Sequence, residues 1–227
     1  MKHFFPLALL LLAACASGPD RSDYRGVRLK PAANPSAVIA AEIGFAQLAQ
    51  TKGQWTAFRA TATDDAVMFM PGPTRAQAWL KGRADPAVAV RWQPHQVWSS
   101  CDGSLAVTRG AWQGPNASGF FTTIWQRQKD GGYKWVLDQG DALDMALPVP
   151  EMINAGVADC GGKDAIAVAR GAWLDTLPAR GGGGSDDGTL VFEWTAAADQ
   201  AHTLTVTMMK GGKMTEVVAQ TVAAPKP

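Results

Sequence analysis

Residues 96–112 read QVWSSCDGSLAVTRGAW, and this stretch decides the expected fold. From Gln96 to Cys101 the residues divide into two alternating sets, with Val97, Ser99 and Cys101 on one side and Gln96, Trp98 and Ser100 on the other. This is the period-two pattern of a β-strand. Asp102-Gly103 is a pair typical of tight hairpin turns, and a second strand is expected from Leu105 to Trp112. The stretch therefore predicts a β-hairpin.

The chain continues this hairpin into a longer meander. Turn residues at 115–119 and 130–132 separate two further predicted strands, Phe120 to Arg127 and Tyr133 to Gln139. An antiparallel sheet can bury one face and expose the other to solvent, which fits the alternation.

Helices are predicted before the meander. Ser36 can cap a first helix, in which apolar residues recur at helical spacing: Val38, Ala41, Phe45, Leu48 and Ala49. A second helix is expected over 54–63, a buried strand over 66–70 and a short helix over 74–81. Helices followed by strands predict an α+β fold, here a curved antiparallel sheet, or cone, packed around the N-terminal helices.

The N-terminus has the layout of a cleavable export signal. Lys2 and His3 precede an apolar run, and Leu12-Ala13-Ala14 leads directly to Cys15. This spacing resembles that of bacterial lipoproteins, which implies cleavage before Cys15 and lipid attachment to its thiol. Plain secretion and a buried cysteine are the alternatives. The run is too short to span a membrane, so we expect a soluble domain held on a membrane by acyl chains.

Ala16 follows Cys15 at a position where lipoproteins retained at the inner membrane often carry aspartate. The resemblance therefore implies a location in the bacterial cell envelope, on the periplasmic face of the outer membrane.

Charge and cysteine content limit the partners. The chain has 21 Lys and Arg against 20 Asp and Glu and lacks the basic run that a phosphate backbone would require, so nucleic acid is not an expected partner.

With Cys15 lipidated, Cys101 and Cys160 remain as an even pair in an oxidising compartment. They are expected to form a disulfide, and two separate buried thiols are the alternative.

Shifts in composition divide the chain. We expect a signal peptide over 1–14, a proline-bearing tether over 15–35, the α+β domain over 36–147, a Gly/Pro-rich linker over 148–188 and a β-meander extension over 189–227. The C-terminal strands, predicted between Leu190 and Val222, could extend the edge of the main sheet or form a small appendage.

Five short phrases, taken in order, resemble the nuclear-transport-factor-2-like superfamily, in particular its bacterial branch with the polyketide cyclase SnoaL. They are AEIGFA at 41–46, GQWTAF at 53–58, DAVMF at 65–69, TIWQR at 123–127 and KWVLD at 134–138. The match spans Ser36 to Asp144 and implies a pocket between the concave face of the sheet and the helices. It implies no particular activity, because the superfamily contains isomerases, dehydratases, cyclases, accessory subunits and binding modules.

Glu42 is the sharpest candidate for a base in such a pocket. It interrupts an otherwise apolar helix, so its carboxylate must be paired, exposed at one edge or raised in pKa. The alternative to a pocket base is a salt bridge to an arginine of the sheet, such as Arg109 or Arg127.

Asp138 and His95 are the other candidates for proton transfer. Asp138 lies on the last strand of the meander with parity opposite to Trp135 and Leu137, and the sequence leaves open which of the two faces is concave. His95 begins a strand and is expected near the rim of the cone, as a functional group or as an ordinary strand residue. No residue spacing completes a metal site and no phosphate loop or dinucleotide motif is present, so we expect neither a metal nor a cofactor.

Nine tryptophans are many for 227 residues, and several fall in or near the meander. They either pack the core or line a pocket that stacks on a flat apolar ligand. Trp98 shares its strand face with polar residues and is expected to be exposed. The aromatic candidates for the pocket are Phe45, Trp92, Trp125 and Trp135.

The sequence favours an envelope-anchored module that binds a small apolar or amphipathic molecule, or serves as an accessory subunit, over a catalyst. The rival interpretation is an isomerase or cyclase with Glu42 or Asp138 as general base. A third is a structural role in which the C-terminal strands pair with a second copy or dock on an envelope protein. A buried, unpaired carboxylate in an enclosed pocket would favour the enzyme, and an accessible apolar pocket would favour the binder.

Overall fold

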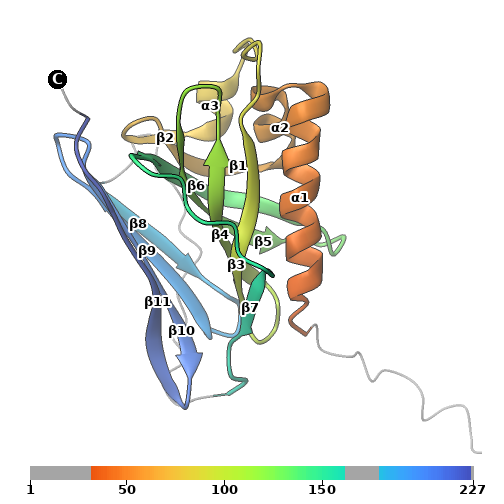
Figure 1. Ribbon diagram of the computed structural model, residues 1–227. Helices are drawn as coiled ribbons and strands as arrows, with labels where there is room; N and C mark the ends of the chain where they lie inside the picture. The colour runs from red at the N-terminus through yellow and green to blue at the C-terminus, as the bar shows by residue number, and fades with distance from the viewer. Residues whose placement is uncertain (1–31, 162–178, 226–227) are drawn as a thin grey trace, which may run out of the picture. The chain divides into compact units, whose positions relative to one another are not determined.

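A long helix begins the part of the chain that the computed structural model describes, residues 32–161 and 179–225 (Figure 1). This helix, α1 (Pro35–Lys52), is capped by Asn34, whose side chain accepts a hydrogen bond from the N–H of Ala37 at 3.1 Å. The prediction that Ser36 is the cap is wrong, because asparagine is a strong cap and proline suits the first helical position that follows it.

The predicted signal peptide, the lipid-attachment residue Cys15 and nearly all of the predicted tether lie outside the described residues. Within the described residues, no helix is long and apolar enough to cross a bilayer.

Short elements connect α1 to the meander. α2 (Gln54–Thr61) leads into β1 (Ala62–Phe69), β2 (Pro73–Arg75) and α3 (Ala76–Leu80). The buried strand predicted over 66–70 is confirmed within β1. The helix predicted over 74–81 is shorter, because its first residues pair with β1 as β2.

The predicted meander is confirmed and forms most of a seven-stranded sheet, which we call the main sheet. Its strands β3 (Arg91–Ser99), β4 (Leu105–Gln113), β5 (Ser118–Arg127) and β6 (Tyr133–Leu143) are each antiparallel to the next. The strand order is β2-β1-β6-β5-β4-β3-β7. The sheet is mixed rather than purely antiparallel, because β1 is parallel to β6, and β7 (Asn154–Val157) is parallel to β3.

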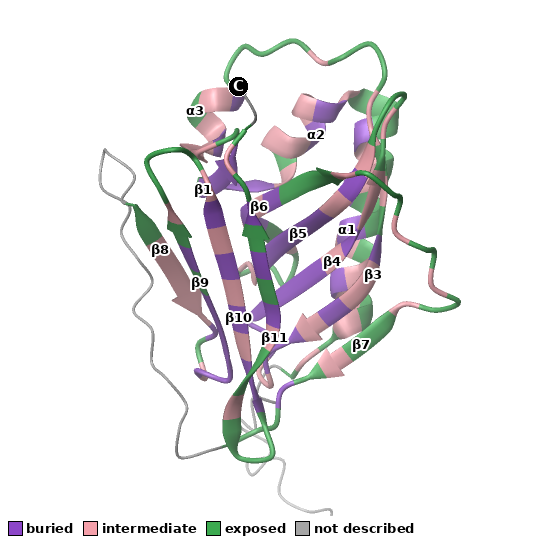
Figure 2. Cartoon of the chain, turned by 60° about the vertical axis from the view of Figure 1, so that its left-hand side comes forward, coloured by how far each residue is buried: buried purple, intermediate pink, exposed green. Residues whose placement is uncertain are grey.

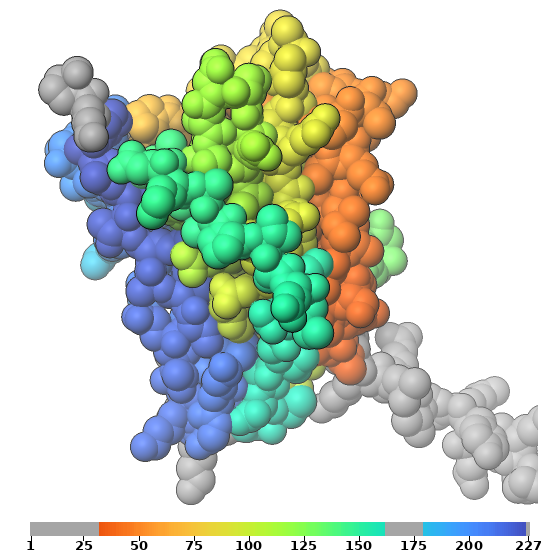
Figure 3. All heavy atoms as spheres, in the orientation of Figure 1, coloured from red at the N-terminus to blue at the C-terminus, as the bar shows by residue number. Residues whose placement is uncertain are grey.

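The segment between β6 and β7 was predicted as the start of a linker. It crosses the surface between α1 and the C-terminal strands (Figure 3). It then adds β7 to the edge of the main sheet, so this part of the predicted linker belongs to the fold.

The main sheet is curved, and α1 and α2 pack against one side of it, the helix face (Figure 1). Two glycines let neighbouring strands approach closely. A Cβ atom on Gly110 would lie 1.9 Å from the carbonyl oxygen of Gln93, and one on Gly140 would lie 2.3 Å from that of Phe120. Any side chain at these positions would push the strands apart, so the close approach requires glycine. The α+β prediction of a curved sheet packed on N-terminal helices is confirmed.

The helix face carries a core that combines small residues with large aromatic ones. Its fully buried members come from both helices and from the strands, and they include Val38, Phe45, Ala57, Met68, Trp125 and Trp135. The small residues let the helices approach the sheet closely, and the aromatic rings fill the remaining width.

The C-terminal strands form a second, separate sheet of four strands. β8 (Arg180–Gly184), β9 (Leu190–Ala196), β10 (His202–Lys210) and β11 (Lys213–Val222) pair antiparallel in the order β11-β10-β9-β8. The glycine run 181–184, predicted as linker, is the edge strand β8. Composition indicated a linker, but glycine still donates and accepts the ladder hydrogen bonds that β9 completes.

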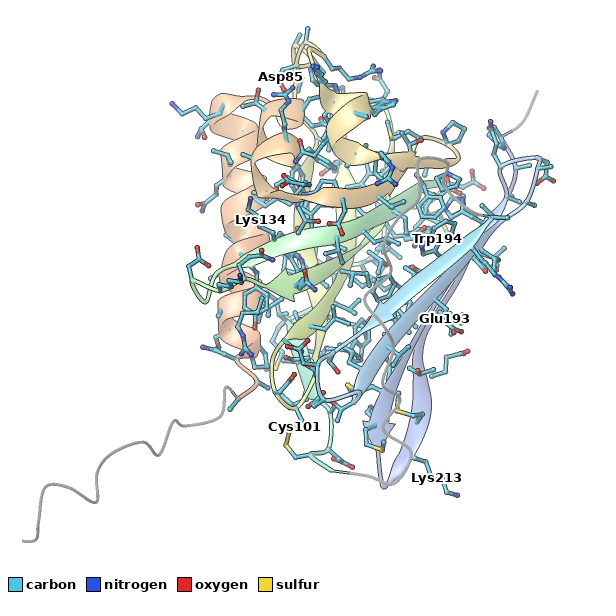
Figure 4. All side chains as sticks on the ribbon, turned by 180° about the vertical axis from the view of Figure 1, so that it is seen from behind. Asp85, Cys101, Lys134, Glu193, Trp194 and Lys213 are labelled. Carbon is cyan, nitrogen blue, oxygen red and sulfur yellow. A yellow bond between two sulfur atoms is a disulfide. The ribbon has the colours of Figure 1, made fainter. Side chains whose placement is uncertain are left out.

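This second sheet covers the other side of the main sheet, which we call the outer face. Adjacent residues of β9 show the arrangement: Trp194 is 1% exposed and points between the sheets, whereas Glu193 is exposed and points away (Figure 4). Because the outer face is covered, β4 and β5 are largely buried along their length (Figure 2). Trp98, expected to be exposed, is half-buried and packs against the core between the sheets.

Two turns of the same design join the sheets. The β3–β4 turn, Ser100–Leu105, reads SCDGSL, and the β8–β9 turn, Ser185–Leu190, reads SDDGTL. In each turn the aspartate Oδ1 accepts hydrogen bonds from the first serine and from the hydroxyl and N–H of the residue after the glycine, at 2.7–3.1 Å.

The two turns also bind each other. The Cys101 N–H donates to Thr189 Oγ1 at 2.9 Å, the Asp102 N–H to Asp187 Oδ2 at 2.9 Å, and the Asp186 N–H to Ser104 Oγ at 2.8 Å. These bonds satisfy backbone groups from both turns and fix the second sheet on the main sheet.

The predicted disulfide between Cys101 and Cys160 is confirmed, with the Cα atoms 5.1 Å apart (Figure 4). It joins the β3–β4 turn to the segment after β7. The Asp159 N–H in that segment donates to the carbonyl of Met209 at 2.9 Å, so the covalent link closes on the same end of the second sheet as the paired turns.

Candidate functional site

Glu42 lies on the buried side of α1 and is 0% exposed. Its Oε1 accepts a hydrogen bond from Trp92 Nε1 at 2.7 Å, and its Oε2 accepts from Trp125 Nε1 at 3.1 Å and from the hydroxyl of Thr108. The alternative of a salt bridge to Arg109 or Arg127 is wrong, because these neutral donors occupy the carboxylate. Burial raises the pKa of Glu42, and the three hydrogen bonds oppose that shift.

Asp138, on β6, also lies on the helix face. Its Oδ2 accepts a hydrogen bond from Thr123 Oγ1 at 2.7 Å. The pKa of Asp138 is raised to about 7, mainly by burial; the Thr123 hydrogen bond opposes this rise and the charge of Glu42 adds to it. At neutral pH this carboxyl therefore exists in both protonation states.

A β-bulge places Trp135 on the same face as Asp138. Between Ile124 and Trp125 the pairing partner on β6 changes from Leu137 to Trp135, so Val136 is an extra residue. The sequence had placed Trp135 and Leu137 on one face. The bulge instead moves Trp135 to the helix-face core and leaves Leu137 in the core with the second sheet. Trp135 therefore shares its face with Asp138.

The two carboxyl groups are connected across the strands by a row of threonines. Thr108 on β4 is the register partner of Thr123 on β5, which is the partner of Asp138 on β6. Thr108 donates to Glu42 and Thr123 donates to Asp138. Each acid thus receives a hydroxyl donor, and neither receives a cation from the part of the chain that the structure describes.

Asp138 opens into a cavity of about 340 Å³ between the helices and the main sheet, which we call the aromatic pocket. Its apolar wall comes from α1, α2 and the sheet: Phe45, Trp55, Phe58, Met68, Phe69, Met70, Val90, Trp92, Trp112 and Phe121. Its polar lining comes from Gln54 and from the β6 segment Asp138–Asp141. The cavity is accessible and mainly apolar, as small-molecule sites are.

The aromatic rings of this wall contact one another and the core edge to face. Phe45 lies with its ring centroid 4.7 Å from that of Phe58 and 4.8 Å from that of Trp92, and Phe58 lies 5.9 Å from Trp135. Such pairs are favoured by the ring quadrupoles and hold the rings in fixed orientations. The wall is therefore built before any ligand binds.

The second sheet supports the pocket from behind. Gln139 lines the pocket, donates to Gln220 Oε1 on β11, and has its own Oε1 3.2 Å from His202 Nε2 on β10. His202 stacks on Phe69, another lining residue, with ring centroids 4.1 Å apart. Burial lowers the pKa of His202, although Gln200 and Asp141 oppose this shift, so the histidine supports the wall as a neutral ring.

The structure divides the aromatic residues proposed from sequence. Phe45 and Trp92 line the pocket, whereas Trp125 and Trp135 are fully buried in the core behind it. Sequence reasoning did not select Trp55, Phe58, Trp112 or Phe121. Trp55 and Phe58 were recognised only as one side of a helix, and nothing local to the sequence says that a cavity faces that side.

His95 is apart from the aromatic pocket. It borders a separate hollow with Arg109 and Asn154, and its buried Nε2 has no hydrogen-bond partner among the described residues. Burial and the neighbouring Arg109 charge lower its pKa. Among the described residues no group of three or more His, Cys, Asp or Glu could hold a metal ion.

No protein-family model and no curated protein matches the chain. Solved structures match about half of it. A protein of unknown function from the DUF3225 family of Pectobacterium atrosepticum is 13% identical over 48% of this chain and 91% of its own, with a TM-score of 0.40.

Two further matches have similar extent. A ketosteroid isomerase-like protein from Erwinia carotovora atroseptica is 18% identical over 48% of this chain and 96% of its own, with a TM-score of 0.37. An NTF-2 like protein of unknown function from Silicibacter pomeroyi is 16% identical over 48% of this chain and 99% of its own, with a TM-score of 0.36. Similarity at this level carries no functional argument.

Proposed function

We propose that the protein binds a small, mainly apolar molecule in the aromatic pocket, with Asp138 contacting the ligand's polar group. The observation that carries this proposal is a half-buried carboxyl in a cavity of about 340 Å³ whose wall is otherwise aromatic and aliphatic. Thr123 is the only described hydrogen-bond donor to Asp138, so the carboxyl can accept a further bond from a ligand.

A neutral flat probe tests this proposal. We expect 2-naphthol to bind saturably, measured by calorimetry and by quenching of tryptophan fluorescence. Ala142→Trp, at the lining residue next to Asp141, should abolish binding by filling the pocket. Ala219→Trp, at an exposed position of β11, is the matched control and should bind normally. Equal binding by both variants would place the probe elsewhere and contradict the proposal.

Proton transfer by Asp138 is a second candidate function, because the pKa of this carboxyl, raised to about 7, suits a general acid or base at neutral pH. The test is exchange of the α-hydrogens of 2-tetralone for deuterium, followed by NMR. An enzyme should accelerate exchange, with a rate that rises as pH passes about 7, and Asp138→Asn should remove the acceleration. Exchange that survives this substitution would exclude Asp138 as the base.

We also propose that the pocket works in the bacterial cell envelope, tethered through lipidated Cys15. The support is the Leu-Ala-Ala-Cys spacing behind a short apolar run. Mass spectrometry of protein from a bacterial membrane fraction should find an acylated N-terminal Cys15. An unmodified chain that begins at another residue would contradict the anchor.

An association role for the C-terminal strands is the remaining proposal, with a second copy or an envelope protein as partner. Its support is that β8 and β11 are the edges of the second sheet, and edge strands carry unpaired backbone groups. Light scattering should then detect a dimer that a proline at exposed Thr221 on β11 disrupts. A monomer at all concentrations would exclude self-association.

A further inference from the structure

The charges that line the aromatic pocket are all of one sign. Asp138 and Asp141 line it, and its described lining includes no lysine, arginine or histidine. Glu42 lies behind Trp92, close enough for its charge to act on Asp138. The potential in the pocket is therefore negative whenever these acids are ionised, and the apolar wall gives little screening.

The aromatic wall is of a kind that attracts cations. A positive charge is drawn to the face of an aromatic ring, most strongly to tryptophan. The protein already uses this attraction at the outer end of the same aromatic cluster. The guanidinium carbon of Arg83 lies 3.4 Å from the ring centroid of Trp79, which is 5.1 Å from that of Trp55, a pocket residue.

We infer that the natural occupant of the pocket is an organic cation: an amine or quaternary ammonium group carried on a small apolar body. This inference rests on the proposed binding function and names its ligand class. The ammonium group would lie against Asp138 and the surrounding rings, and the apolar body would fill the remainder. An anion would meet Asp138 and Asp141 with no basic partner in the described lining.

The arrangement around Asp138 fits this occupant. Its single described donor, Thr123, contacts Oδ2, which leaves Oδ1 free of described partners. A carboxylate held with only one hydroxyl donor is poorly compensated for its lost hydration, and a bound cation supplies the missing charge. Glu42 is held differently, because three donors already occupy it.

Three probes of one shape and different charge test the inference. Benzyltrimethylammonium, neopentylbenzene and benzylsulfonate share a benzyl group and a tetrahedral head with charge +1, 0 and −1. Their affinities can be compared by displacement of 2-naphthol. We expect the cation to bind at least about tenfold more tightly than the neutral probe, and the sulfonate to bind more weakly than both.

Asparagine variants assign the effect to residues. Asp138→Asn should reduce the preference for the cation over the neutral probe by about tenfold, with both affinities measured on the same variant. Displacement of 2-naphthol by the neutral probe on that variant shows that the pocket is intact. Asp141→Asn should weaken the cation only about twofold, because this exposed side chain is screened by solvent. If Asp138→Asn fails to fold, the Asp141 variant and the three-probe comparison still decide whether the pocket prefers a cation.

The outcomes separate this inference from the proposed function. If the three probes bind equally, or the sulfonate binds best, the pocket is a binding site but the cationic ligand is wrong. If no probe binds in a manner blocked by Ala142→Trp, the binding function itself fails. If the pocket binds the cation selectively and Asp138→Asn removes that selectivity, both the cationic ligand class and the proposed binding function are supported.

Discussion

The two faces of the main sheet are formed by alternate residues of the same strands, but different elements cover them and different side chains fill the space beneath. On the outer face, Val107 and Ile124 meet aliphatic and methionine residues of the second sheet, and the space between the sheets is a continuous core. On the helix face, Thr108 and Thr123 occupy the corresponding positions of β4 and β5, and the space above them contains two acids and a cavity.

This difference indicates that packing on the outer face provides stability, whereas the helix face provides the candidate site. A sheet covers the outer face with many apolar side chains, so close packing is achieved there. Two helices cover the other face, and at the end nearest β6 they leave an aromatic-lined space open. The two acids and two threonines on that face are tolerated because each has a hydrogen-bond partner.

Truncating one phenylalanine on each face should show the largest difference in stability. Phe192 on the outer side and Phe121 on the pocket side are 4% and 7% exposed. Phe192→Ala should lower the free energy of unfolding by about 3–5 kcal/mol. Phe121→Ala should cost about 1–2 kcal/mol less, because its ring borders an existing cavity and has fewer contacts to lose. Urea denaturation measures both, and equal losses would contradict the comparison.

Removing the disulfide should destabilise the protein without affecting the pocket. Cys101 and Cys160 are separated by 59 residues, and closing such a loop stabilises a fold by about 2–4 kcal/mol. The double variant Cys101→Ser, Cys160→Ser should lose that amount in urea denaturation. Because neither cysteine lines the pocket, binding of 2-naphthol should be unchanged at temperatures where the variant is folded. A parallel loss of affinity would show that the two faces are coupled.

Replacing Glu42 should show how much its hydrogen bonds contribute to stability and how much its charge raises the pKa of Asp138. Glu42→Leu leaves the Trp92 indole N–H without its acceptor and removes one of the two acceptors of both the Trp125 N–H and the Thr108 hydroxyl, which should cost about 2–3 kcal/mol. Glu42→Gln keeps one acceptor oxygen and should cost less. Both substitutions remove the charge that helps to raise the pKa of Asp138, so carbon-13 NMR titration should find that pKa lowered. An unchanged value would show that Glu42 is protonated throughout.

The smallest effect is the dependence of stability on pH. The pKa of Asp138 is about 7 in the folded protein and about 3.9 in an unfolded chain. Between these values the folded state binds more protons, so this residue's stabilising contribution is complete below pH 4 and is lost as pH rises to 7.

Asp138→Asn should remove that dependence. The variant should gain stability relative to the parent by about 1–3 kcal/mol between pH 4 and pH 8, measured by urea denaturation at each pH. Asp141→Asn, at an exposed position of the same strand, is the control and should show no such gain. A constant difference between the Asp138 variant and the parent would contradict the raised pKa.

The elements of the main sheet were predictable because their signals are local. Asp102-Gly103 forms the turn that the dipeptide favours, and the strands on either side follow their alternating residues. The cap of α1 was misplaced by two residues, since Asn34 and Ser36 are both acceptable caps and only the helix start distinguishes them. The glycine run 181–184 was misassigned because composition does not reveal the partner strand β9.

The candidate site was predictable in its residue types and less so in its geometry. Glu42 was selected as an acid on an otherwise apolar helix and Asp138 as an acid on the last strand of the meander, and both lie on the helix face with raised pKa values. The partners of Glu42 were not predictable, because Trp92 and Trp125 come from strands 50 and 83 residues away. The face of Trp135 depended on the bulge at Val136, which no local pattern marks.

The sequence alone determined the order of the N-terminal helices and the meander β3 to β6, the turns of that meander and the pair of cysteines that form the disulfide, since these depend on neighbouring residues and on counting. Only the tertiary structure decided which face each ring and acid occupies, that the C-terminal strands form a separate sheet, and that a cavity remains beside Asp138. The physical reason is that burial and local electrostatics depend on which distant segments meet. The acidity of Asp138 is accordingly a property of the assembled fold.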